Sequence, residues 1–117
     1  MIIHVTDGQV VGETESTLLS MMQQGTINAL FILKNSGVNT LSYRFQQYTG
    51  TAWADVGISG TDYYNTLLAG ETRNIKLVSS YPQVRLQGNA SGGAFLEFAV
   101  IRYFNRASGG ALPILSL

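Results

Sequence analysis

Turn-forming residues divide this chain into short apolar runs, and this division is the feature that most restricts its fold. Thirteen glycines stand against two prolines, and glycine-containing turns recur at roughly ten-residue intervals. The clearest run, Leu41–Tyr48, alternates apolar and polar residues with the period of two that a half-buried strand requires. The sequence therefore predicts an all-β, two-sheet antiparallel β-sandwich of jelly-roll or immunoglobulin-like type, with roughly seven to nine short strands.

The N-terminal quarter is harder to assign than the rest of the chain. The turn signal Asp7-Gly8 lies between two short apolar runs, so residues 1–11 are predicted to form a small hairpin. Residues 17–22 fit either one helical turn capped by Ser16 or a strand, and the all-β context favours a strand. The remaining strands are expected at 26–34, 41–48, 52–58, 72–78, 81–87 and 94–106.

These segments form one domain with three parts. Residues 1–25 are expected to form the N-terminal hairpin or arm and the first strand, and residues 26–106 the core of the sandwich. Residues 107–117 begin with Ser108-Gly109-Gly110, which is typical of a hinge, and continue as an apolar tail.

The composition excludes several classes of function. Charged residues make up only 12% of the chain, and seven basic residues, scattered singly, balance seven acidic ones. This pattern argues against nucleic-acid binding. The absence of cysteine excludes disulfides, thiol catalysis and zinc–thiolate sites. Because no run approaches ~20 apolar residues and the first residues do not resemble a signal peptide, we expect synthesis in a cytoplasm and no membrane partner.

Residues suited to catalysis are few, and no motif surrounds them. His4 is the only histidine, and no Gly-x-Ser-x-Gly supports a Ser-His-Asp triad. Glu97 is the one carboxylate within an apolar run, whereas the others lie in or beside expected turns. We therefore predict no catalytic residue, no cofactor and no metal, and a protein that is not an enzyme. A β-sandwich enzyme that uses two carboxylates is left open as an alternative.

Aromatic residues gather in the middle of the chain. Exposed Trp and Tyr side chains can stack on sugar rings or anchor a protein interface, but Tyr43, Phe45 and Trp53 are assigned first to the core. Tyr63 and Tyr64 are adjacent and point to opposite sides of any strand, so one of them is expected to be exposed. Trp53, Tyr63 and Tyr64 are the candidate ligand platform of a carbohydrate- or receptor-binding module.

The run AFLEFAVIRYFNR, residues 94–106, is apolar on both faces. Leu96, Phe98 and Val100 are assigned to the core, so the opposite face needs a second cover. That cover is either the chain's own terminal segments or another subunit, and the apolar tail fits both alternatives. The predicted interface comprises positions on this run, with Glu97 and Arg102 as its polar members, and on the tail: Phe95, Glu97, Ile101, Arg102, Tyr103, Leu112, Ile114, Leu115 and Leu117.

The small size, the lack of cysteine and the polar, uncharged surface accompany the segments LFILKNSGVNTLSYRFQ and LLAGETRNIKLVSSYPQVRLQG and the long apolar last strand. In these features the chain resembles the small β-sandwich structural proteins of tailed bacteriophage particles, especially capsid decoration (cement) proteins. The resemblance implies a non-enzymatic virion protein that forms a homo-oligomer, with a trimer favoured, and binds the major capsid protein or another virion protein. The carbohydrate- or receptor-binding module is the second hypothesis.

Overall fold

The computed structural model describes residues 2–22, 27–56 and 65–103, of which residues 2–6 and 103 are described by their backbone alone. Nine strands and no helix occur in these ranges, as the alternating apolar runs predict. The strands are β1 (Ile2–Val11), β2 (Ser16–Met22), β3 (Ile27–Asn35), β4 (Leu41–Tyr48), β5 (Trp53–Val56), β6 (Asn65–Leu67), β7 (Thr72–Ser79), β8 (Gln83–Asn89) and β9 (Ala94–Tyr103).

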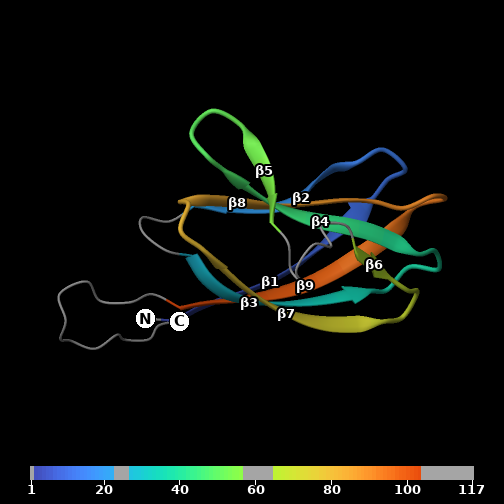
Figure 1. Cartoon of the computed structure of the whole chain (residues 1–117). Coiled ribbons are helices and arrows are strands. Elements are labelled where there is room, and N and C mark those ends of the chain that lie inside the picture. Colours follow the sequence, from blue (N-terminus) through green and yellow to red (C-terminus); the bar gives the residue numbers. More distant parts are fainter. Residues whose placement is uncertain (1, 23–26, 57–64, 104–117) are drawn as a thin grey trace.

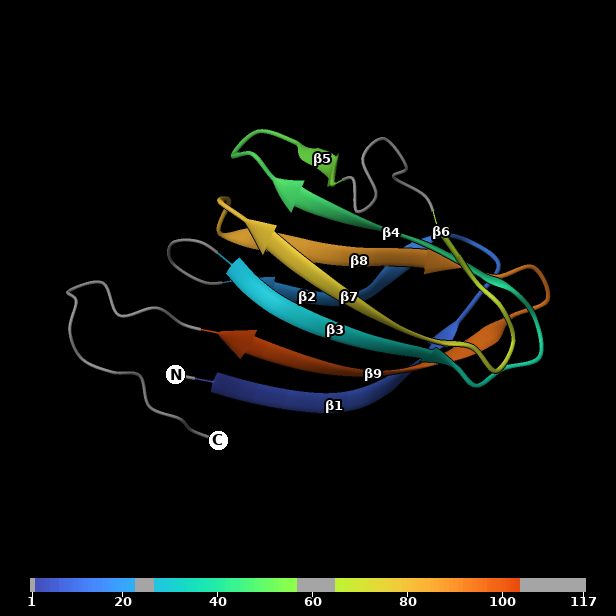
Figure 2. The same ribbon diagram turned by 60° about the horizontal axis from the view of Figure 1, so that its bottom comes forward.

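The strands form two antiparallel sheets packed face to face (Figures 1 and 2). The first sheet has the order β1-β9-β3-β7, and the second has the order β2-β8-β4-β5, with β6 pairing the other half of the same edge of β4. The chain alternates between the sheets at nearly every connection, and β4–β5 is the one pair of sequence neighbours that is hydrogen-bonded among the described strands. This is the jelly-roll arrangement, with β5 and β6 together in the place of one strand. The immunoglobulin-like alternative, in which several consecutive strands pair, is wrong.

The predicted N-terminal hairpin is also wrong, because residues 2–11 form one continuous strand. Its register with β9 runs without a break from Ile2 opposite Tyr103 to Val11 opposite Ala94. Gly8 serves packing rather than a turn: a Cβ at this position would lie 2.7 Å from Cζ of Phe95, whose ring covers the glycine. The strand expected at residues 17–22 is confirmed as β2, with a register shift between Thr17 and Leu19.

The core lies between the sheets and is made by alternate residues of the inner strands. Ring centroids of Phe31 from the first sheet and Phe45 from the second lie 4.8 Å apart, and Tyr43 contacts Phe45 edge-on at 6.3 Å. Leu96, Phe98 and Val100 of β9 are buried as expected. Each such side chain contributes ~1.5–3 kcal/mol when fully buried, and this packing fixes which residues of each strand face outward.

Candidate functional site

The outer face of the first sheet is apolar in its middle, where β9 and β3 lie side by side. In the strand register, Ile101 of β9 lies beside Leu30 of β3, and Ala99 lies beside Ile32. The exposed fractions are 38% for Phe95 and larger on the edge strands, where Val10 and Val78 are 75% and 59% exposed. We call this surface the outer apolar face; its apolar members are Val10, Leu30, Ile32, Val78, Phe95, Ala99 and Ile101.

A shallow hollow of about 220 Å³ lies on this face. Ile32 and Ala99 form its apolar wall, and Lys34, Thr72 and Glu97 lie at its polar end. Lys34 and Glu97 are direct register partners on β3 and β9, and both side chains are exposed. The outer apolar face therefore carries a positive and a negative group side by side, and a second positive group, Lys76, lies beside Leu30 on β7.

Arg102 does not share this face with Phe95, Glu97 and Ile101. It follows the parity of Val100, so its side chain lies on the core side of the sheet, where its Nη2 donates a hydrogen bond of 3.0 Å to the carbonyl of Met22 on β2. Burial lowers the pKa of Arg102 from its usual range because the charged form loses solvation. Arg102 therefore links the two sheets and does not point outward with Phe95, Glu97 and Ile101, as the predicted interface requires.

Among the other predicted interface positions, Tyr103 is described by its backbone alone. Leu112, Ile114, Leu115 and Leu117 lie outside the described residues, as do Tyr63 and Tyr64 of the expected ligand platform. The apolar tail consequently stays a prediction.

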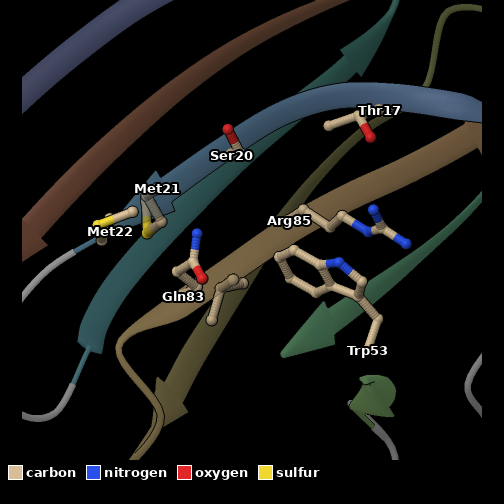
Figure 3. Close-up of a pocket in the computed structure, with 8 residues that line it drawn as sticks. Thr17, Ser20, Met21, Met22, Trp53, Gln83 and Arg85 are labelled. Carbon is tan, nitrogen blue, oxygen red and sulfur yellow. The ribbon is translucent and has the colours of Figure 1, made fainter. Parts of the chain in front are cut away.

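Trp53 is part of a groove on the outer face of the second sheet and not of the core. Tyr48 is its register partner on β4, and the two rings lie 5.2 Å apart at a tilt of 53°. The guanidinium carbon of Arg85, on β8, lies 4.1 Å from the indole centroid. The groove has a volume of about 400 Å³ (Figure 3). It is lined by Thr17, Ser20, Met21, Met22, Trp53, Gln83, Val84 and Arg85.

A row of hydrogen-bonded side chains crosses the sheet beside this groove. Nε of Arg85 donates to Oε1 of Gln46 at 2.9 Å, and Nε2 of Gln46 donates to Oδ1 of Asp55 at 3.0 Å. Asp55 and Glu15 both pair with Arg44, at 3.1 and 2.7 Å. The row follows the register, because Arg85, Gln46 and Asp55 are successive partners on β8, β4 and β5.

No local pattern in the sequence indicates this groove. In the sequence, Arg85 is one of several polar residues that alternate with apolar ones along a strand. It lies near Trp53 because β8 pairs with β4, which is distant in the chain, and β4 pairs with β5. The alternation of apolar and polar residues indicates whether Arg85 and Trp53 are exposed, but not that the two side chains contact each other. In the residues that the structure describes, no group of three or more His, Cys, Asp or Glu side chains could hold a metal ion. The same ranges contain no helix long and apolar enough to cross a membrane.

No family model and no curated protein matches the chain. Among solved structures, a chain from the Bacillus endospore appendages, described as a family of disulfide-linked pili, is similar with a TM-score of 0.63 and 16% identity, over 88% of this chain and 86% of that chain. The crystal structure of PirA gives a TM-score of 0.58 at 14% identity, over 85% of this chain and 93% of that chain. Likeness at these identities establishes a shared fold. A chain of infectious bursal disease virus, Gx strain, reaches 0.46 at 10% identity, over 87% of this chain and 31% of that chain, too low to support a shared fold.

Proposed function

We propose that this chain is a non-enzymatic structural protein that assembles with copies of itself through the outer apolar face. The observation that carries the proposal is the apolar surface on the two inner strands of the first sheet, β9 and β3, which Val10 on β1 and Val78 on β7 extend to the edges. A β9 strand that is apolar on both sides gains from cover on both sides, at ~25 cal/mol per Å² of apolar surface removed from water. Because Lys34 and Glu97 lie side by side, the same face on another copy can offer each of them an opposite charge.

The pilus chain of the Bacillus appendages supports this proposal, since it shows that the shared fold is used by a protein that assembles. Its description includes disulfide links, which this chain cannot form within its own cysteine-free sequence. The contact between copies is therefore non-covalent, and apolar burial is the available source of its free energy.

The proposed particle is a virion, and the oligomer is proposed to be a trimer that decorates a phage shell. Its partner would be the major capsid protein or another virion protein. This part of the proposal is supported by the resemblance to capsid decoration proteins and by the low content of charged residues, 12%. The protein would be made in the host cytoplasm and act on the assembled shell.

Native mass measurement with surface variants tests the assembly. The wild-type protein is expected near three times 12.7 kDa. Ile32→Asp places a charge in the hollow, and Val78→Asp places one on β7 at a position that is 59% exposed. Both should release the 12.7 kDa monomer. Val38→Asp, 87% exposed in the β3–β4 turn, is the matched control and should leave the mass unchanged.

Urea unfolding of each variant separates loss of assembly from loss of fold. A wild-type protein that stays monomeric at about 0.1 mM and does not bind purified shells would refute the proposal. So would an oligomer whose mass is unchanged by both Ile32→Asp and Val78→Asp.

A further inference from the structure

The groove on the second sheet presents a positively charged group, Arg85, that has no carboxylate partner among the residues the structure describes. The ion pairs among the described residues join Arg44 to Glu15 and Asp55, and Arg73 to Glu71, so none of them involves Arg85. Within the same part of the chain, the side chain of Arg85 makes one hydrogen bond, from Nε to Gln46. No described residue therefore accepts a hydrogen bond from its two terminal amino groups, which can bind a ligand.

The orientation of this guanidinium is fixed before any ligand arrives. Gln46 is buried at 6% exposure and holds Nε of Arg85 with its Oε1, while its own Nε2 is held by Asp55. The indole of Trp53 supports the guanidinium plane from one side at 4.1 Å. A planar guanidinium held in this way presents its amino groups as a fork, the geometry that binds a carboxylate with two parallel hydrogen bonds.

The rest of the groove suits a ligand that is polar at its edges and apolar on one side. Figure 3 shows Thr17 and Ser20 on β2 facing the groove, with Gln83 on the neighbouring strand, so hydroxyl and amide groups line one side. Met22, which is 66% exposed, and Trp53 supply apolar surface. The volume of about 400 Å³ lies within the range of ~300–1,000 Å³ that is usual for small-molecule sites.

We propose that this groove binds an acidic saccharide, with the carboxylate of the sugar on the terminal amino groups of Arg85 and the ring hydroxyls on Ser20 and Gln83. A saccharide ring combines a carboxylate with hydroxyl edges and an apolar C–H patch, which matches the three kinds of surface in the groove. The mode differs from simple stacking on an exposed tryptophan, because Arg85 already covers one side of the Trp53 ring. It extends the proposed function from assembly to recognition and does not depend on it.

Trp53 makes the test direct, because it is the only tryptophan and its fluorescence reports on the groove. The probes are sialyllactose and a glucuronate-containing disaccharide, with lactose as the neutral saccharide and sodium acetate as the bare carboxylate. At least one acidic saccharide should bind at least about tenfold more tightly than lactose and than acetate, and more weakly as salt is added. The two acidic probes distinguish a sialic acid ligand from a uronic acid ligand.

Variants separate recognition from a change of fold. Arg85→Ala should raise the Kd of the better acidic probe at least about tenfold, and Arg85→Lys, which keeps the charge but loses the fork, should give an intermediate value. Lys76→Ala removes one positive charge from the opposite sheet and should leave the Kd unchanged. The Trp53 indole N–H resonance should move on titration in the wild-type protein.

Four results would overturn the proposal: no change at either acidic probe up to about 20 mM, equal binding of lactose, equal binding of acetate, or an unchanged Kd in a folded Arg85→Ala variant. None of them bears on the native mass, so a failure here and a failure of the assembly proposal are distinguishable.

Discussion

Asn35 offers the sharpest test of how this sandwich is held together. It lies at the end of β3, is 0% exposed, and is one of the few buried polar side chains. Its Nδ2 donates to the carbonyls of Asn39, at 2.7 Å, and Leu67, at 3.0 Å, and its Oδ1 accepts from the backbone N–H of Gly37 at 3.0 Å. One amide thus joins the β3–β4 turn to β6, across the two sheets. Asn35→Ala removes all three bonds.

The expected loss follows from these three bonds. A net contribution of ~0.5–1.5 kcal/mol per hydrogen bond, with an additional cost for a buried acceptor left unpaired, gives a loss of roughly 2–4 kcal/mol. The bond to Leu67 is buried, whereas the other two are part-buried and can be replaced in part by water. Since a domain of this size is stable by about 5–15 kcal/mol, the variant should remain folded but lose much of its stability.

Urea unfolding measures this loss, and two further variants sharpen it. Asn39→Ala removes one part-buried bond, from Nδ2 of Asn39 to the carbonyl of Gly93 at 2.8 Å, and should cost only about 0.5–1.5 kcal/mol. Asn35→Asp keeps the shape and the acceptor but turns a carboxylate toward two carbonyl oxygens, which raises its pKa in the folded state. As pH rises, the unfolded chain loses this proton first, so the stability of Asn35→Asp should fall with rising pH.

Two outcomes would refute the reasoning. A loss below about 1 kcal/mol in Asn35→Ala would mean that water replaces the amide at little cost. A stability of Asn35→Asp with the same pH dependence as the wild type would mean that its carboxylate does not face the two carbonyls.

Two further predictions concern close packing and pH. Gly88→Ala should lower the free energy of unfolding in urea by about 1–3 kcal/mol, because its Cβ would lie 2.7 Å from Cδ1 of Leu18. Gly12→Ala, whose Cβ would have nothing within 4 Å, should change that free energy by less than about 0.5 kcal/mol. Equal effects of the two variants would contradict this account of the packing. A hydrogen bond from the backbone of Leu68 holds the pKa of Glu71 below its usual range, so its stabilisation is present above the ordinary pKa and is lost as pH falls through the lowered one. Thermal unfolding between about pH 5 and pH 2 should therefore be less pH-dependent in Glu71→Gln, and identical slopes would exclude this role.

Strand positions were predictable because alternation is a local signal. The strand expected at 41–48 coincides with β4, and that at 72–78 differs from β7 by one residue. In β7 the buried residues Ile75 and Leu77 alternate with exposed neighbours, as the sequence indicates. The all-β class and the sandwich follow from such runs, because each needs a second layer to cover its apolar face.

Two predictions from the sequence are wrong, and in both the same local sequence pattern is compatible with two different structures. Asp7-Gly8 is typical of a hairpin turn, yet Gly8 is present because the ring of Phe95 lies on it, a contact between strands that are far apart in sequence. The sequence favours the core for Trp53 over an exposed ligand platform, but β5 pairs with β4 so that Trp53 lies beside Tyr48 on the outer face. Strand register decided both cases: between β1 and β9, which are far apart in sequence, for Gly8, and between the consecutive strands β4 and β5 for Trp53.

The two candidate surfaces lie on different sheets, and this separation makes assembly and recognition compatible. The outer apolar face belongs to β1, β9, β3 and β7, whereas the groove with Arg85 belongs to β2, β8 and β5. Because the sheets pack against each other through their inner faces, their outer faces point away from one another (Figure 1). A copy that covers the outer apolar face leaves the groove open. An oligomer formed in this way carries several grooves, so a weak affinity at each one is converted into a much higher avidity for a surface rich in acidic saccharides.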